Sequence, residues 1–246
     1  LAFYLAEHQA QGASLLGFYH RSFLEAVTAH CFASRETRET RHQHMSVYFL
    51  ACAKGLDPAK EWETDAVRGF AECVFHLVKA GQPERAAALV SNFPFLLHKL
   101  RVDLLQGVFE DYEMLRCEAP AEVAKELEIW SAFFREKAHI LRRGNEEWPA
   151  HKILLQLAVE HADDSPLTTA AEQWLKENRG DWLWLRRVPR LAHAQKNPCQ
   201  AVLEGHTSMV EGALALSDGR LLSWAWDNTL RLWDGQSGAC LAVLEG

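Results

Sequence analysis

The heptapeptide Cys199–Gly205 (CQAVLEG) returns almost unchanged as Cys240–Gly246 (CLAVLEG), with a period of 41 residues. Between the two copies lie four short apolar or alternating segments, which are typical of β-strands. These segments are Met209–Leu216, Arg220–Trp226, Thr229–Trp233 and Leu241–Leu244. Asp218-Gly219 and Asp227-Asn228 separate them, and such pairs form tight turns. The C-terminal part is therefore expected to form consecutive antiparallel hairpins.

This repeat opens with Gly205-His206 and reaches Trp233-Asp234 before it starts again. A period of about 40–45 residues with these dipeptides is the signature of a four-stranded propeller blade. The segment resembles the WD-repeat family, whose motif positions here are Gly205, His206, Asp218, Gly219, Trp233 and Asp234. Because propellers close with about four to eight blades, we expect a first blade at residues 201–246 of a longer protein.

In the WD-repeat family, a buried network joins a histidine, a strand hydroxyl, a turn aspartate and a tryptophan. The resemblance places these roles at His206, Ala225, Asp227 and Trp233. Ala225 departs from the pattern because it has no hydroxyl. We therefore expect His206 to meet Asp227 directly or through water, at a cost of about 1 kcal/mol for the missing hydrogen bond.

The chain from about residue 20 to 178 carries apolar residues at helical spacing. One expected helix runs from Val123 to Leu141, and another begins with Ser165 as N-cap. The residues expected to be buried in this all-α region are Phe70, Val74, Phe109, Trp130 and Phe134. Short loops with proline or glycine favour antiparallel helix pairs. We expect a helical spacer at residues 35–191 and a polar linker at residues 192–200.

The first residues have a different pattern. A short strand is expected at Leu15–His20, followed by a helix in which Ser22 and Glu25 have the spacing of a capping box. A histidine-rich helix at residues 41–53 is expected to turn Val47, Tyr48 and Ala51 inward. This order is similar to the end of a winged-helix module, so residues 1–34 are expected to be a winged-helix remnant.

Four segments resemble signal-transduction ATPases of the NACHT and NB-ARC type, which are called STAND NTPases. They are Phe18–Phe23, Arg41–Phe49, Phe75–Gly81 and Asp218–Trp224. The resemblance implies a P-loop ATPase domain upstream, followed by a winged helix, a helical spacer and WD repeats. The present chain has no G-x-x-x-x-G-K-[ST] sequence, so nucleotide hydrolysis is not expected from it.

The composition of the chain limits which kinds of partner are expected. The 246 residues are 48% hydrophobic and 24% charged, with a net charge of −7, which disfavours nucleic acid as a partner. No apolar run approaches the roughly 20 residues that span a bilayer. The six cysteines show no C-x-x-C spacing, which favours a reducing cytoplasm. Protein partners are expected, including the upstream ATPase domain, and oligomerisation is possible in the full-length protein.

Histidines near the N-terminus suggest a metal site, but the spacing argues against one. His42 and His44 fall on different faces of a helix, and nearby His20 and His30 complete no set of four ligands. No local sequence supports a serine or cysteine nucleophile. We therefore expect no catalytic residue, no metal and no cofactor in this chain.

Two functions from different classes remain open. The first is a regulatory or sensor region of a multidomain signal-transduction ATPase, acting through protein–protein interaction or ligand sensing by the spacer and the propeller. The alternative is an enzyme whose helical region is catalytic and whose WD repeats recruit substrate. Titratable groups that converge on a concave site would favour the alternative.

Overall fold

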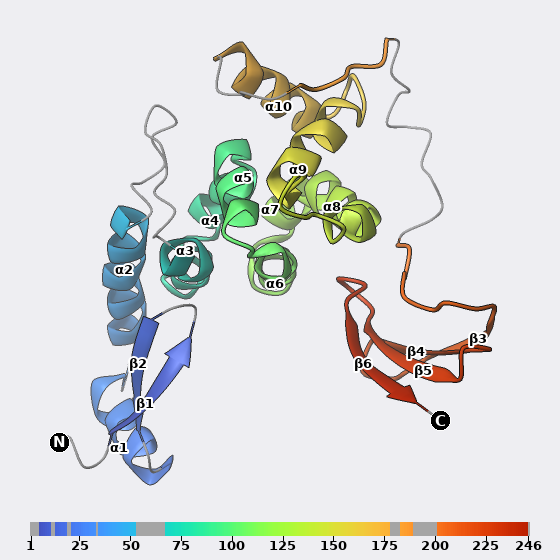
Figure 1. Cartoon of the computed structure of the whole chain (residues 1–246). Helices are drawn as coiled ribbons and strands as arrows, with labels where there is room; N and C mark the ends of the chain where they lie inside the picture. Colours follow the sequence, from blue (N-terminus) through green and yellow to red (C-terminus); the bar gives the residue numbers. More distant parts are fainter. Residues whose placement is uncertain are drawn as a thin grey trace. The chain divides into compact units, whose positions relative to one another are not determined.

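The computed structural model describes residues 5–10, 13–18, 21–32, 34–52, 67–177, 183–188 and 201–245. Within these ranges the chain forms ten helices and six strands, in the order drawn in Figure 1. The chain divides into two compact units. The first is Leu1–Leu104 with Glu113–Ala124, and the second is Leu105–Tyr112 with Lys125–Gly246. The linker predicted at residues 192–200 lies outside the described residues.

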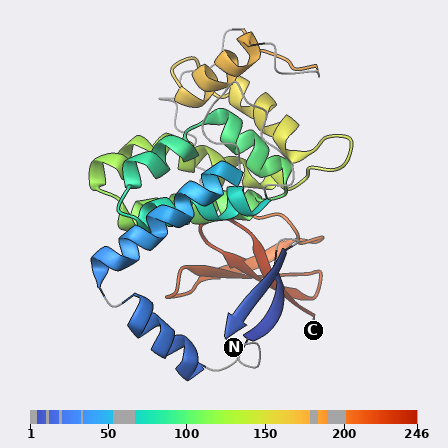
Figure 2. The ribbon, with the colours of Figure 1, turned by 90° about the vertical axis from the view of Figure 1, so that its left-hand side faces the viewer.

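The N-terminal segment begins with a hairpin. Strands β1 (Leu5–Ala10) and β2 (Ala13–Phe18) pair antiparallel, with Leu5 opposite Phe18. Helix α1 (Arg21–Cys31) follows and is separate from the longer α2 (Arg35–Cys52) (Figure 2). In the predicted winged-helix remnant at residues 1–34, the described residues thus form a hairpin and then one helix. The strand and the helix start are local signals, and a winged helix also requires helices packed on one another, so the winged-helix assignment stays a prediction.

Helix α2 packs on α3 (Val67–Lys79), but through a face other than the predicted one. Its buried residues are Ser46, Phe49 and Leu50, whereas the Val47 and Tyr48 side chains are 55% and 59% exposed. The prediction that Val47 and Tyr48 point inward was wrong because the packed face contains polar residues. A search for apolar residues alone therefore selects the wrong side of this helix.

Two short helices complete the first part of the helical region. Helix α4 (Pro83–Val90) has a proline in its first turn, and α5 (Phe93–Arg101) is capped by Asn92, whose side chain accepts a hydrogen bond from the Phe95 N–H at 2.9 Å. Gly81 separates α3 from α4 with a φ of 71°, a left-handed conformation that glycine adopts without a steric penalty.

The remaining helices are α6 (Leu105–Glu118), α7 (Ala121–Glu126), α8 (Glu128–Leu141), α9 (Ala150–Val159) and α10 (Pro166–Lys176). The single helix predicted at Val123–Leu141 is interrupted at Leu127 and forms α7 and α8. Ser165 holds the N-cap position of α10, but its hydroxyl bonds to His161 Nδ1 at 2.7 Å instead of capping the helix. The expected burial is confirmed: Phe70, Val74, Phe109, Trp130 and Phe134 are each at most 6% exposed.

The C-terminal strands form one antiparallel sheet in the order β3-β4-β5-β6. The strands are β3 (Val210–Ala215), β4 (Arg220–Ala225), β5 (Thr229–Asp234) and β6 (Cys240–Glu245). Leu222 in β4 lies opposite Leu214 and Leu232, which fixes the register of the three strands. The hairpins predicted from the repeat are confirmed for these residues.

The predicted fold class was nevertheless wrong. The described part of the chain is mainly helical and ends in a single open four-stranded sheet, in which β3 and β6 are both edge strands. This sheet is not a propeller blade, since a propeller is a ring of several such sheets. The repeat specifies short strands and tight turns, which are local features. Closure into a ring depends on contacts between sheets, which one repeat does not encode.

Candidate functional site

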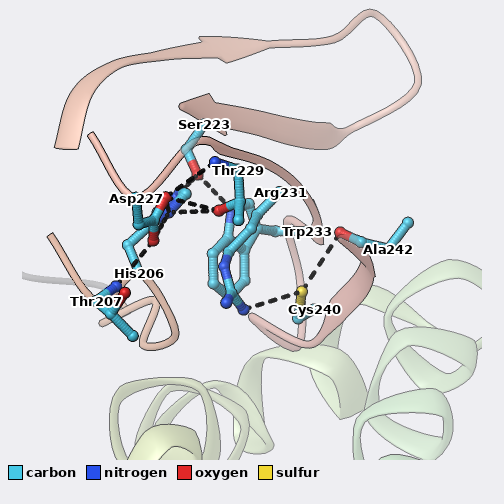
Figure 3. Close-up of polar contacts among 9 residues, drawn as sticks. All are labelled: His206, Thr207, Ser223, Asp227, Thr229, Arg231, Trp233, Cys240 and Ala242. Carbon is cyan, nitrogen blue, oxygen red and sulfur yellow. Dashed lines mark hydrogen bonds and ion pairs between the residues drawn. The ribbon is translucent and has the colours of Figure 1, made fainter. Parts of the chain in front are cut away.

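Four side chains meet beside the C-terminal sheet in a chain of hydrogen bonds (Figure 3). Asp227 Oδ2 lies 3.0 Å from His206 Nδ1, and His206 Nε2 lies 2.7 Å from Ser223 Oγ. The indole N–H of Trp233 donates to the same Ser223 oxygen at 2.8 Å. The structure thus brings His206, Asp227 and Trp233 together, as the network prediction expected of them.

The hydroxyl in this network belongs to Ser223, not to the Ala225 position. Both residues lie on the same face of β4, because side chains two residues apart in a strand share a face. Trp233 pairs with Leu221, and Ser223 is the next residue along on that face. Sequence spacing does not distinguish Ser223 from Ala225, and the position of the Trp233 indole selects Ser223. The expectation of a network broken at Ala225 is therefore wrong.

Asp227 is the most heavily bonded member of the network. Its carboxylate accepts hydrogen bonds from the Thr207 N–H at 2.9 Å, the Thr229 N–H at 3.1 Å and the Thr229 hydroxyl at 2.8 Å. Desolvation would raise the pKa of Asp227, but these bonds and the one from His206 together hold that pKa well below its ordinary value. Asp227 therefore ties the segment before β3 to the turn between β4 and β5.

The direction of each proton follows from the donors available. An ionised carboxylate can only accept, so His206 Nδ1 carries the hydrogen that it donates to Asp227. In the neutral imidazole, Nε2 then accepts from the Ser223 hydroxyl, and the Ser223 oxygen accepts the Trp233 indole N–H. The side chains of His206 and Asp227 are each 6% exposed, and Trp233 is 1% exposed. Every member of this buried chain has a partner.

The order Asp–His–Ser is also the order of an acyl-transfer triad. A serine nucleophile must reach its substrate, but Ser223 is buried and its oxygen already accepts the Trp233 N–H. A substrate carbonyl would have to displace the indole to approach Ser223. The network is therefore built to hold the sheet together, and Ser223 is not a free nucleophile.

Of the other predicted motif residues, three lie in or directly beside turns, and the fourth, Gly205, lies close to side chains of the sheet. Asp218 accepts hydrogen bonds from the backbone and side chain of Arg220, and Gly219 has a φ of 84°. Asp234 Oδ1 accepts from the Gln236 and Ser237 N–H groups at 3.1 and 2.6 Å. At Gly205, an added Cβ would meet the Arg231 guanidinium first and would lie 3.2 Å from the ring of Trp233.

A second feature of the sheet is a face that is apolar except at one end, where Arg220 lies opposite Asp234. Residues directly opposite one another on neighbouring strands point to the same side of a sheet. The register therefore places the following residues together, and we call them the apolar face: Gly212, Leu214, Leu222, Trp224, Leu230, Leu232, Ala242 and Leu244. Leu214, Leu230 and Leu244 are 54%, 39% and 55% exposed, so much of this surface is open.

The histidines that suggested a metal are dispersed, with one exception. His44 and His30 are exposed, and His20 lies outside the described residues. His42 of α2, however, meets His76 of α3, with 2.8 Å between their Nδ1 atoms. Among the described side chains, no group of three or more histidine, cysteine or acidic residues is placed to hold a metal ion. Sequence spacing missed the pair because its members lie on different helices.

None of the described helices has both the length and the apolar character needed to cross a bilayer. Comparison with protein-family models and with curated proteins gave no match for this chain.

Proposed function

We propose that this chain is a non-catalytic, protein-binding region of a cytoplasmic signal-transduction ATPase. The observation that carries the proposal is the apolar face of the C-terminal sheet. Contiguous apolar surface of this kind marks an interaction site on a folded protein. The link to an upstream ATPase is supported by the resemblance of residues 15–81 to STAND NTPases.

The chemistry of the apolar face specifies its partner. None of its eight residues carries a charge or a side-chain hydrogen-bonding group apart from the Trp224 indole. Nucleic acid requires basic residues, and a charged peptide requires compensating charges. An apolar protein surface requires neither, and burying it gains about 25 cal/mol per Å². The proposed occupant is therefore a protein that presents an apolar surface to the sheet.

The network on the other face of the sheet supports this role. It fixes β4, β5 and the segment before β3 through His206, Ser223, Asp227 and Trp233. A surface whose shape is fixed before binding loses less conformational entropy when the partner arrives. The buried network thus makes the apolar face a preorganised binding surface.

The alternative, a catalytic helical region, has less support. It requires titratable groups converging on an open site. Among the described helices, the histidines that converge are His42 and His76, and they lie between two packed helices. We therefore favour binding over catalysis.

The proposal is tested with a photoreactive amino acid placed at Leu214 in the protein expressed in its own cells. The same probe at Ala215 is the matched control, because Ala215 is exposed on the same strand but belongs to the opposite face. We expect a cross-linked protein from position 214 and none from position 215. Mass spectrometry identifies that protein, which is then purified.

Affinity measurements complete the test. Leu214→Arg should weaken binding of the purified partner by at least about tenfold, since a cation would be buried against apolar surface. Ala215→Arg should leave the Kd unchanged. The proposal is wrong if no protein cross-links at position 214, or if Leu214→Arg and Ala215→Arg bind the partner equally well.

A further inference from the structure

Helices α2 and α3 meet at a pair of imidazoles. His42 Nδ1 and His76 Nδ1 lie 2.8 Å apart, which is a hydrogen bond between the two rings. Aromatic neighbours hold both rings in place. His76 stacks on Phe49 with ring centroids 5.3 Å apart, and His42 meets Phe75 edge to face at 5.7 Å. The bond therefore lies within the packed surface that joins the two helices.

The bond requires a defined protonation state. One Nδ1 must carry a hydrogen and the other must offer a lone pair, which is satisfied when both imidazoles are neutral. A proton added to the accepting Nδ1 removes the lone pair and places two N–H groups against each other. Protonation of that atom thus turns the attraction between the two rings into a repulsion.

The charged groups around the pair add to this effect. Lys79, one turn after His76 on α3, disfavours a charge on His42, and Arg68 disfavours one on His76. Glu72 acts in the other direction, with its Oε2 4.0 Å from His76 Nε2. On α2, Glu39 lies one turn before His42, and its carboxylate is bonded to Arg35 at 2.6 Å.

Burial lowers the pKa of the two histidines, as the two cations do. Desolvation is the largest effect on both rings and lowers the pKa of His42 and of His76 below the ordinary value for histidine. When α2 separates from α3, both rings become hydrated and regain ordinary values near 6.5. The separated state therefore binds more protons in mildly acidic solution, and acid favours it.

We propose that the His42–His76 pair is an acid-sensitive latch that holds α2 on α3 when both rings are neutral and releases α2 when the pair is protonated. Release exposes Phe49 and Leu50, which are 3% and 9% exposed in the closed arrangement. The stabilisation is complete above the ordinary pKa of histidine and is lost as the pH falls below it. The latch is a regulatory device independent of the apolar face of the sheet.

The test is hydrogen exchange of the α2 amides at residues 46–50 in the whole chain, measured between pH 7.5 and 5.0. The exchange rates are corrected for the intrinsic pH dependence of exchange and are then compared with the rates of the α4 amides. We expect protection of α2 to fall at least about tenfold over this range, since protonation of the pair removes the hydrogen bond between the two rings and sets two N–H groups against each other.

Two variants and one control separate a latch from a general loss of stability. His42→Gln and His76→Gln each leave a side chain that hydrogen-bonds without titrating near neutral pH, so α2 protection should become less dependent on pH. His44→Gln, an exposed neighbour on α2, should behave as the parent protein. The proposal is overturned if the parent shows no pH dependence in α2. It is also overturned if both pair variants, with folded α3 and α4, keep the full dependence.

Discussion

Ser223 is the residue on which the polar network depends. Its hydroxyl oxygen accepts from Trp233 and its O–H donates to His206, so the one side chain links the indole to the histidine–aspartate pair. Removing the hydroxyl would leave a buried indole N–H and a buried imidazole nitrogen without that partner. A buried polar group left unsatisfied costs about 1–3 kcal/mol. One small side chain thus has a larger effect than its size suggests.

We therefore expect Ser223→Ala to destabilise the sheet by about 2 kcal/mol. Exchange of the β4 and β5 amides under increasing urea measures this loss for the sheet itself. Ala225→Ser is the matched experiment, since it adds a hydroxyl two residues away on the same strand. The sheet should gain no stability from it, because Trp233 already donates to Ser223. A stabilising Ala225→Ser would place the network hydroxyl at residue 225.

Two turns of the sheet lie so close together that each limits which residues the other can contain. The turn after β5 contains Gly235, and a Cβ at this position would overlap the backbone carbonyl oxygen of Gly219 in the turn before β4. A backbone atom cannot move aside as the end of a flexible side chain can. Gly219 itself has open space around an added Cβ but a φ of 84°. The two glycines are thus needed for different physical reasons.

Gly235→Ala should therefore destabilise the sheet by about 3 kcal/mol, at the upper end of ordinary substitutions. Gly219→Ala should cost about 1 kcal/mol, which is the penalty for a side chain in the left-handed region. Urea unfolding of the two variants, followed by exchange of the strand amides, compares the losses. Equal losses would contradict the steric reason given for Gly235.

Within the second unit, the helical part of the chain contacts the C-terminal sheet. Arg142, just after α8, donates to the Ser237 carbonyl at 2.8 Å and lies over the Phe109 ring at 5.6 Å. Burial lowers the pKa of Arg142, and Asp234 partly offsets that effect. The neighbouring Arg143 pairs with Glu204 at 2.9 Å, but its side chain is 65% exposed. The two arginines thus make contacts of different strength.

Arg142→Ala should loosen the loop between β5 and β6 and cost about 1.5–3 kcal/mol, the usual contribution of a hydrogen bond from a charged group. Arg143→Ala should cost less than about 1 kcal/mol, since exposed ion pairs contribute little. Amide exchange at residues 236–239 measures the loosening, and urea unfolding measures the loss. If the two variants behave alike, Arg142 does not anchor the loop.

The local structure of this protein follows from its sequence alone. Helical spacing predicted the all-α region and the burial of Phe70 and Trp130, because a helix must bury its apolar face. The 41-residue repeat predicted the four C-terminal strands, since alternating segments and turn residues act over a few neighbours. It also singled out His206, Asp227 and Trp233, which the structure places together.

Contacts between residues that are distant in the sequence became visible in the folded structure. It selected Ser223 over Ala225, because two residues on one strand face are equivalent until the Trp233 indole is placed. It paired His42 with His76 across two helices. The C-terminal strands form a single open sheet, whereas the repeat had predicted a propeller blade. Each of these depends on contacts between separate elements, and such contacts follow from packing in three dimensions rather than from spacing along the chain.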